Sequence, residues 1–271
     1  MSKIIVGFDF SSGSAKAVDL AIDISNRVGL DLRLVYVKDK EQNEVPIREE
    51  IERRIQGVSH LFKGIKMDYV IRQGKVSQEL CAQCEEDHGA LIVVGSHGMS
   101  GFSKTFLGRN TYRTIAESKA PVLTLREDFN FNKSLDRIVV PIDNSADTRQ
   151  KLRTATQFAK LFDSELHILG LYTSENSTIR HIVDGYMQAT DTYLNKHEVK
   201  HVNKCVSVPK NLTLSTLEYA DEINADMIVI MTEQEPNLSR LLLGNYAEQM
   251  LTLSTRPVLT VRPEQVNGLA K

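Results

Sequence analysis

The sequence predicts an α/β protein built from two tandem units, each a five-stranded parallel sheet flanked by helices. Three observations predict this fold class. Short apolar runs alternate with stretches of helical apolar spacing, the second half of the chain repeats the first, and the run Leu91–Val94 is continuous and β-branched. Such a run is typical of a strand covered on both faces. Strands separated by helices favour the right-handed crossovers of a parallel sheet.

The strands and helices of the first copy follow in order from this spacing. The expected strands are Ile4–Phe8, Leu32–Val37, Met67–Ile71, Leu91–Val94 and Pro121–Leu125. Four helices are expected between these strands. The first carries Ala15, Val18, Ala21, Ile22 and Val28 on one face and stops at Gly29, and Pro46 opens the second. The third covers Val76–Asp87 and the fourth covers Asn110–Ser118. The second copy follows the same order with a longer second helix, from about Thr178 to His197.

The repeat itself rests on matched segments with a nearly constant offset. Asp143 follows Asp9 at an offset of 134 residues, and Pro257–Val261 follows Pro121–Leu125 at an offset of 136. Self-similarity at a fixed spacing indicates duplication of a structural unit. We therefore expect one domain over residues 1–127 and a second over residues 135–264, joined by the polar linker Glu127–Ser134.

Composition argues against several classes of protein. The chain has 271 residues, of which 41% are hydrophobic and 25% charged, and its net charge is −2. A nearly neutral chain has no overall field to attract nucleic acid or an acidic membrane. No apolar run approaches the roughly 20 residues that span a bilayer. The N-terminus lacks the pattern of a signal peptide, and the three cysteines do not suit a disulfide framework. We expect a cytoplasmic protein with neither nucleic-acid nor membrane partners.

Two segments of the first copy end strands at the edge where parallel α/β sheets bind ligands. The first is Gly7-Phe8-Asp9. Asp9 could accept a hydrogen bond from a ribose or an adenine amino group, or it could form an Asx-turn into the following helix. The residues alone leave both readings open.

The second segment is the glycine-rich stretch from Gly95 to Gly108, between the buried fourth strand and the helix near Asn110. Glycines permit positive φ and let backbone N–H groups approach phosphate oxygens closely. The helix N-terminus after Gly108 adds unpaired donors and a dipole that favours an anion. The stretch is neither a P-loop nor a G-x-G-x-x-G fingerprint.

In these residues the chain resembles the universal stress protein family. Gly95, Gly98 and Gly108 fall in the register of that family's phosphate loop, G-x2-G-x9-G-(S/T), and the resemblance covers nearly the whole chain, once per half. It implies two Rossmann-like, adenine nucleotide alpha hydrolase-like domains, and a stress-response role through ATP or AMP bound in the first, which Mg²⁺ could accompany. The nucleotide-binding residues expected are Gly7, Phe8, Asp9, Val37, Val94, Gly95, Ser96, His97, Gly98, Gly108, Arg109 and Asn110.

The first copy departs from the family pattern at two positions. Arg109 stands where the family has Ser or Thr, and it could grip a phosphate, fill the pocket or point to solvent. Gly7 stands where the family often has proline, which would leave the loop less rigid.

The second copy departs further. Met231 and Gln234 replace the first two glycines of the loop, Gly244 remains, and Glu233 and Glu235 would repel a phosphate. We expect this copy to be a structural partner without nucleotide. Single-domain relatives pair through their final strands, so the resemblance also implies that the two domains pair within the chain. A further homodimer stays open.

Three other motifs resemble functional sites but are interpreted as ordinary structural or contact residues. His197-Glu-Val-Lys-His201 matches H-E-x-x-H, but the repeat places it where a helix gives way to a strand, so we expect no metal there. The pair Cys81 and Cys84 falls in mid-helix, which favours packing over redox chemistry. His97 has no identifiable partner carboxylate, so a contact with ligand or solvent is the ordinary interpretation.

These residues leave three functions to compare. The first is a regulatory, nucleotide-binding stress protein, and the alternative is a nucleotide-free tandem scaffold that acts through protein–protein contacts. An enzyme ranks last, because no catalytic constellation is visible in the sequence.

Overall fold

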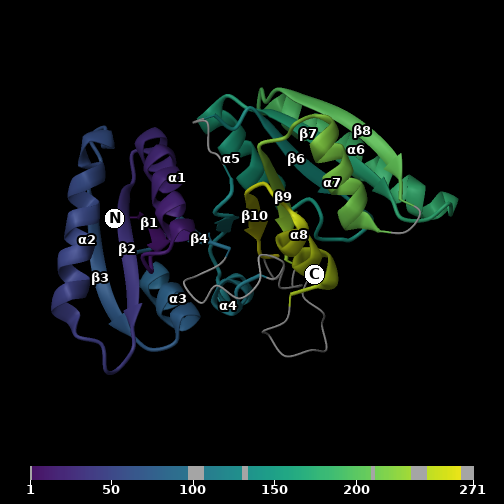
Figure 1. Ribbon diagram of the computed structural model, residues 1–271. Coiled ribbons are helices and arrows are strands. Elements are labelled where there is room, and N and C mark those ends of the chain that lie inside the picture. The colour runs from purple at the N-terminus through teal and green to yellow at the C-terminus, as the bar shows by residue number, and fades with distance from the viewer. Residues whose placement is uncertain (1, 97–106, 130–133, 209–210, 233–242, 264–271) are drawn as a thin grey trace, which may run out of the picture.

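The protein folds into two repeats of one α/β unit (Figure 1). The structure is a computed structural model that describes residues 2–96, 107–129, 134–208, 211–232 and 243–263. We call β1 to β5 with α1 to α4 the first repeat, and β6 to β10 with α5 to α8 the second repeat. The fold class and the order of elements predicted from the apolar spacing are both confirmed.

Apart from one 3-10 turn in the first repeat, the elements of the two repeats correspond one to one. The first repeat contains β1 (Lys3–Gly7), α1 (Ser12–Val28), β2 (Asp31–Lys38), α2 (Glu44–Val58), a 3-10 turn (Ser59–Leu61), β3 (Met67–Gln73), α3 (Val76–Glu86), β4 (Leu91–Gly95), α4 (Arg109–Glu117) and β5 (Val122–Leu125). The second contains β6 (Arg137–Ile142), α5 (Leu152–Phe162), β7 (Glu165–Tyr172), α6 (Ser177–Lys196), β8 (His201–Ser207), α7 (Leu212–Glu222), β9 (Met227–Met231), α8 (Asn245–Leu253) and β10 (Val258–Val261).

Two helices of the first repeat begin earlier than the sequence predicts. The Asn43 side chain caps α2 by accepting a hydrogen bond from the Val45 backbone N–H at 3.1 Å, so the helix starts at Glu44. Pro46 then lies in the first turn, where a backbone N–H has no intrahelical acceptor and its loss removes no helical hydrogen bond. The helix α4 begins at Arg109, one residue before the predicted start.

All ten strands belong to one sheet in the order β3-β2-β1-β4-β5-β10-β9-β6-β7-β8. Within each repeat the pairing is parallel. In the first repeat β1 pairs with both β2 and β4, and in the second β6 pairs with both β7 and β9. The strand order therefore reverses at β1 and at β6, and a ligand crevice is expected at the carboxyl ends of the strands there.

The two repeats are joined by antiparallel pairing of their last strands, β5 and β10. Two buried threonines reinforce the seam, because Thr124 Oγ1 donates to the Val258 carbonyl at 3.2 Å and Thr260 Oγ1 donates to the Val122 carbonyl at 3.0 Å. The expectation that the final strands meet within one chain is confirmed. Figure 1 shows the sheet running from one repeat into the other through this seam.

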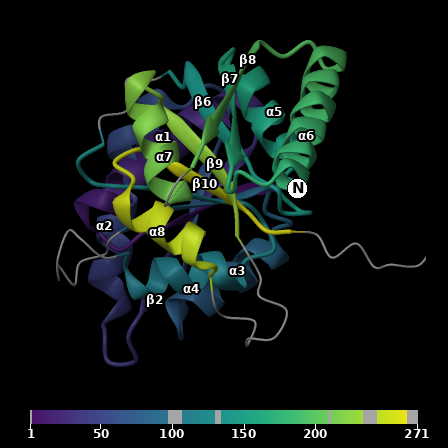
Figure 2. The ribbon, with the colours of Figure 1, turned by 90° about the vertical axis from the view of Figure 1, so that its right-hand side faces the viewer.

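Helices cover both faces of the sheet and bury two cores. Figure 2 shows α5 and α6 on one side of the strands of the second repeat, and α7 and α8 on the other. One core combines side chains of α1, α2, α5 and α6 with one face of the sheet, and the other combines α3, α4, α7 and α8 with the opposite face. Each core thus crosses the boundary between the repeats. None of the helices in the described ranges is both long and apolar enough to cross a bilayer.

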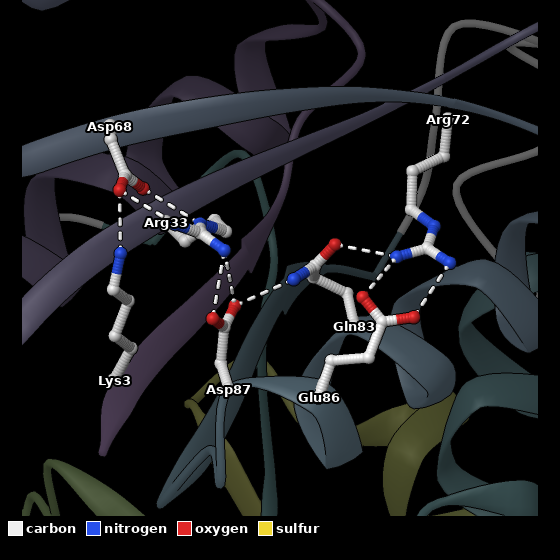
Figure 3. A network of polar contacts seen from close by, with 7 residues as sticks. All are labelled: Lys3, Arg33, Asp68, Arg72, Gln83, Glu86 and Asp87. Atoms are coloured by element: carbon white, nitrogen blue, oxygen red, sulfur yellow. Dashed lines mark hydrogen bonds and ion pairs between the residues drawn. The ribbon is translucent and has the colours of Figure 1, made fainter. Parts of the chain in front are cut away.

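A polar network fastens α3 to the edge of the sheet in the first repeat (Figure 3). The Arg33 guanidinium donates two hydrogen bonds to Asp68, at 2.8 and 2.7 Å, and contacts both oxygens of Asp87 at 2.8 and 3.0 Å. Lys3 pairs with the same Asp68. Burial alone would raise the pKa of Asp68, but the hydrogen bonds from Arg33 and Lys3 outweigh it and hold that pKa below its usual value.

The same network continues through Arg72 on β3. Its guanidinium contacts Glu79 at 2.7 Å, Gln83 at 2.6 Å, and Glu86 at 2.9 and 3.0 Å. Gln83 in turn donates to Asp87 at 2.7 Å, which links the two arginines (Figure 3). Because all three acceptors of Arg72 lie on α3, the arginine fixes the position of that helix over β3.

Replacing Arg33 with methionine should lower the free energy of unfolding by about 2 kcal/mol, because Asp68 and Asp87 would lose their shared half-buried partner. The Arg33 and Asp87 side chains are only 23% and 12% exposed. A matched control is Lys119→Met, whose ion pair with Glu85 is 77% and 59% exposed. That change should cost less than about 0.5 kcal/mol. Urea unfolding of both variants makes the comparison, and equal losses would contradict the structural role of the network.

Candidate functional site

The first repeat contains an open cavity of about 210 Å³ at the carboxyl ends of β1 and β4, where the strand order reverses. Loops after two strands, together with α1, α3 and α4, supply its walls (Figure 1). Its lining residues are Gly7, Phe8, Asp9, Ser11, Ser14, Val35, Val37, Val76, Leu80, Val94, Gly95, Gly108, Arg109, Asn110, Thr111 and Thr114.

Most of the residues predicted from the sequence are brought together here. Ser96 is the exception among the described ones, because it is 3% exposed and does not line the cavity. His97 and Gly98 lie outside the described residues. Three helices contribute lining residues that were not predicted from the sequence, namely Ser14 of α1, Val76 and Leu80 of α3, and Thr111 and Thr114 of α4. Their spacing of three or four residues is the signal that could have placed each pair on one helix face.

The glycines serve the site by leaving space rather than by adopting unusual backbone angles. A Cβ on Gly95 would lie 2.9 Å from the backbone carbon of Gly13, so the end of β4 packs directly against the start of α1. A Cβ on Gly7 would lie 2.9 Å from a methyl of Val94. Gly108 has φ −59° and forms the N-cap of α4. Positive φ, expected from the glycine-rich pattern, is found at none of these three described glycines.

Asp9 both forms a turn and faces the cavity. Its Oδ1 accepts hydrogen bonds from the Ser11 backbone N–H at 3.1 Å and from the Ser11 hydroxyl at 2.5 Å. Ser11 in turn caps α1 by accepting from the Ser14 N–H at 3.1 Å. The residue between them, Phe10, has φ 65°, which is rare for a bulky side chain and costs of order 1–3 kcal/mol where it occurs. The turn geometry is therefore fixed by these contacts, and it presents Asp9 to the crevice.

The start of α4 forms the opposite wall. The Gly108 N–H donates to the Ser96 carbonyl at 2.9 Å, and Thr111 Oγ1 donates to the Gly95 carbonyl at 2.9 Å, which ties the helix to the end of β4. Gly108 supplies no side-chain cap, and the first turn carries no acidic residue. The N–H groups of such a turn favour an anion.

Arg109 and Asn110 line the mouth of the cavity and are both exposed. Arg109 therefore does not fill the interior. It has no hydrogen-bond or ion-pair partner among the residues that the structure describes. Asp9 and Arg109 are the two charged side chains of the lining, and they lie on opposite walls.

The structure also shows where the H-E-x-x-H residues lie. The helix α6 ends at Lys196 and β8 begins at His201, so the H-E-x-x-H residues do not share a helix face. His201 instead contacts the Val199 carbonyl at 2.8 Å and Asp191 at 3.0 Å. No group of three metal-ligating side chains is found within the described ranges.

Cys81 and Cys84 pack within α3, as expected. Burial raises the pKa of the Cys81 thiol to about 12 and that of Cys84 to about 11. Both thiols are therefore protonated at neutral pH, and a protonated thiol is a poor nucleophile.

The corresponding place in the second repeat is nearly full. Only about 20 Å³ remains beside Asp143, Ser145 and Thr148, which repeat the turn around Asp9 with the same hydrogen bonds. Larger side chains occupy the positions that small ones hold in the first repeat. These are Pro141 for Gly7, Leu171 for Val37, Met231 for Gly95, Tyr246 for Asn110 and Lys151 for Ala17.

Lys151 is the least expected of these residues, because it is a lysine with 3% exposure. Its Nζ donates to the Thr148 carbonyl at 2.5 Å and lies 3.2 Å from the Thr148 hydroxyl. The regular helix α5 begins only at Leu152, so the chain before it turns inward and carries the lysine with it. Burial lowers the pKa of Lys151 to about 8, and the nearby Asp143 carboxylate opposes this shift.

The buried Lys151 should make stability rise with pH. Its pKa is about 8 in the folded state and 10.5 in the unfolded state, so between these values the unfolded chain binds more protons. The free energy of unfolding should gain about 3 kcal/mol across that window, at 1.36 kcal/mol per pKa unit. Lys151→Met should remove this gain and unfold less readily at pH 7. Urea titrations of both proteins from pH 7 to 11 test this, and a difference between them that does not vary with pH would contradict it.

Comparisons with known proteins agree with this geometry. The sequence profile of the Universal stress protein family matches residues 1–126 and again residues 134–262. The universal stress protein YxiE of Bacillus subtilis is 27% identical over 150 residues, which cover 46% of this chain and 99% of that protein. A universal stress protein of Mycolicibacterium smegmatis is 25% identical over 134 residues, so the match spans only 45% of that relative's own length.

A solved structure shares the whole fold. The crystal structure of a universal stress protein from Archaeoglobus fulgidus superposes with a TM-score of 0.75 over 97% of both chains, at 21% sequence identity. The likeness at this identity shows the two-repeat architecture. Since the family profile covers both halves of the sequence, the chain belongs to the universal stress protein family.

Proposed function

We propose that the first repeat, residues 1–127, binds an adenine nucleotide, ATP or AMP, in the cavity between β1 and β4. The observation that carries this proposal is the contrast between the repeats. In the first repeat a cavity of about 210 Å³ is open beside a helix start that has no side-chain cap. In the second repeat larger side chains leave only about 20 Å³ open at the same place. In this proposal the second repeat, residues 135–264, is a structural partner that holds no nucleotide.

The chemistry of the walls fits the parts of such a ligand. Val35, Val37, Val76 and Leu80 form an apolar side that can take the faces of an adenine ring. Asp9 can accept a hydrogen bond from a ribose hydroxyl. The N–H groups at the start of α4, with Arg109 beside them, can take the phosphates.

Mg²⁺ would join through the phosphates of ATP, because Asp9 is the one carboxylate among the described lining residues. A single carboxylate with substrate phosphates is an ordinary environment for this ion. The carboxylate of the lining, Asp9, is held in the turn by hydrogen bonds from Ser11, so we assign binding rather than turnover to the site. A stress-response role would then follow from the occupancy of the first repeat.

Introducing a large side chain of the second repeat into the first should weaken nucleotide binding. Asn110→Tyr places at the mouth of the cavity the residue that Tyr246 supplies in the other repeat, and Asn110 is exposed, so the fold should tolerate it. We expect isothermal titration calorimetry to show at least a tenfold loss of ATP affinity, about 1.4 kcal/mol. The matched control, Tyr246→Asn, should leave that affinity unchanged.

Nucleotide binding by the unmodified protein distinguishes a nucleotide-binding protein from a nucleotide-free scaffold. Mass spectrometry of the purified, denatured protein should also detect a copurified adenine nucleotide. If the unmodified protein binds neither ATP nor AMP at millimolar concentration, the nucleotide-free scaffold becomes the better account. Binding that appears only in Arg109→Ser would favour that account as well.

Arg109 should distinguish phosphorylated ligands from adenosine. Arg109→Ala should weaken ATP binding roughly tenfold, since hydrogen bonds to charged groups contribute about 1.5–3 kcal/mol and exposure reduces this value. Adenosine, which has no phosphate, should bind with unchanged affinity. Arg113→Ala, one helical turn further along α4 and also exposed, is the control. Equal losses for ATP and adenosine would show that Arg109 does not contact the phosphates.

A further inference from the structure

A second open site lies at the far edge of the sheet, away from the cavity of the first repeat. The groove between β8 and α7 encloses about 340 Å³. β8 is the last strand of the sheet and pairs only with β7 among the described strands. We call this site the β8–α7 groove, and its lining includes Lys204, Val206, Leu214, Glu218, Tyr219 and Glu222.

The first repeat shows what fills this place when it is closed. There the guanidinium of Arg72 reaches from β3 to Glu79 of α3, and to Gln83 and Glu86 of the same helix, as Figure 3 shows for the last two. β3 and β8 have equal lengths, as do α3 and α7, so their residues correspond directly. The register confirms the match, because Arg72 pairs with Val37 and Val206 pairs with Leu171, the equivalent of Val37.

The second repeat lacks the arginine and keeps only one of its three acceptors, Glu222 in place of Glu86. Val206 replaces Arg72, and Ser215 replaces Glu79, so the groove opens. Glu222 replaces Glu86 and is already neutralised by Lys204, whose Nζ lies 2.8 Å from it and 4.6 Å from the centre of the Tyr219 ring. This pair occupies the end of the groove towards the C-terminus of α7.

The other end of the groove is left with a net negative charge and an apolar surface. Glu218 is exposed and has no hydrogen-bond or ion-pair partner among the described residues. Leu214, one turn earlier on α7, is 49% exposed, which is unusual for a leucine of this fold. Val206, on the strand, lines the same groove. A carboxylate and two aliphatic side chains in one groove suit a ligand with an apolar stem and a cationic head.

We propose that the β8–α7 groove binds an arginine side chain carried by an extended segment of a partner protein, which adds to the free edge of β8. The stem of the arginine would pack on Val206 and Leu214, and its guanidinium would meet Glu218 and the hydroxyl of Ser215. An arginine suits this place better than a lysine, because its planar fork can donate to several acceptors at once. The partner would thus fill from outside the space that Arg72 occupies in the first repeat, with Glu218 as its acceptor.

Backbone pairing would supply the rest of the interaction. An edge strand presents unpaired N–H and C=O groups, and strand addition to such an edge is a common mode of peptide recognition. Asn203, Cys205 and Ser207 of β8 are exposed along this edge. The groove then selects which residue of the added strand faces α7.

Titration of the full chain with a short blocked peptide tests the proposal. The probe is acetyl-Thr-Val-Arg-Val-Thr-amide, compared with the same peptide containing neutral citrulline. We expect the arginine peptide to shift the amide NMR signals of β8 and α7 with a millimolar or tighter Kd. The citrulline peptide should bind at least fivefold more weakly. No shifts in these elements, or equal shifts with both peptides, would overturn the proposal.

Three variants complete the test. Val206→Arg supplies the missing side chain from within, and it should reduce binding of the arginine peptide at least tenfold. Val202→Arg, four residues earlier on the same strand and 41% exposed, adds the same charge outside the groove and should reduce binding less than twofold. Glu218→Gln, at an exposed position, should weaken binding at least threefold without affecting the fold. Unchanged binding in both Val206→Arg and Glu218→Gln would place the peptide elsewhere and reject the site.

Discussion

The pairing of the first strand of each repeat with two neighbours is the constraint on which the rest of the structure depends. Because β1 lies between β2 and β4, the chain must cross one face of the sheet after β1 and the opposite face after β4. The starts of α1 and α4 therefore diverge, and a crevice opens between them. The contact of Gly95 with the backbone of Gly13 shows how tightly the two connections meet at its floor.

The same order of strands and helices produces a site in one repeat and a filled core in the other, so side-chain volume and the start of one helix decide between the two outcomes. The turn around Asp9 is reproduced around Asp143 down to its hydrogen bonds. What differs is the bulk of the surrounding residues and the late start of α5, which carries Lys151 inward. Burying an amine opposes folding, and the contact with Thr148 offsets part of that cost. The second repeat thus retains the shape of a binding unit while its interior serves packing.

Much of the fold could be predicted from the sequence because apolar spacing and internal repetition report directly on backbone structure. The order of strands and helices followed from this spacing, and the matched segments placed the two last strands in equivalent positions. The edge that holds the site followed from Asp9 and Gly95, which come directly after strands. The helix start at Glu44 was missed because Asn43 competes with Pro46 as a signal, and the cap decides. Contributions such as Leu80 and Thr114 needed the packing of α3 and α4 on the sheet. Lys151 and Arg72 were missed because long charged side chains ordinarily indicate a surface position, and the partners of Arg72 come from another element, α3.

The seam between β5 and β10 has a consequence for how the protein is made. Val122 pairs with Thr260, so the partner of β5 is synthesised only after almost the entire second repeat. A ribosome adding roughly 5–20 residues per second needs on the order of ten seconds or more to travel that far. During this interval a nascent first repeat can complete its four parallel pairings but leaves an apolar strand edge without a neighbour. Such edges readily associate with other chains. Chaperone protection during translation would therefore matter most for Val122–Leu125, the segment that afterwards lies in the centre of the finished sheet.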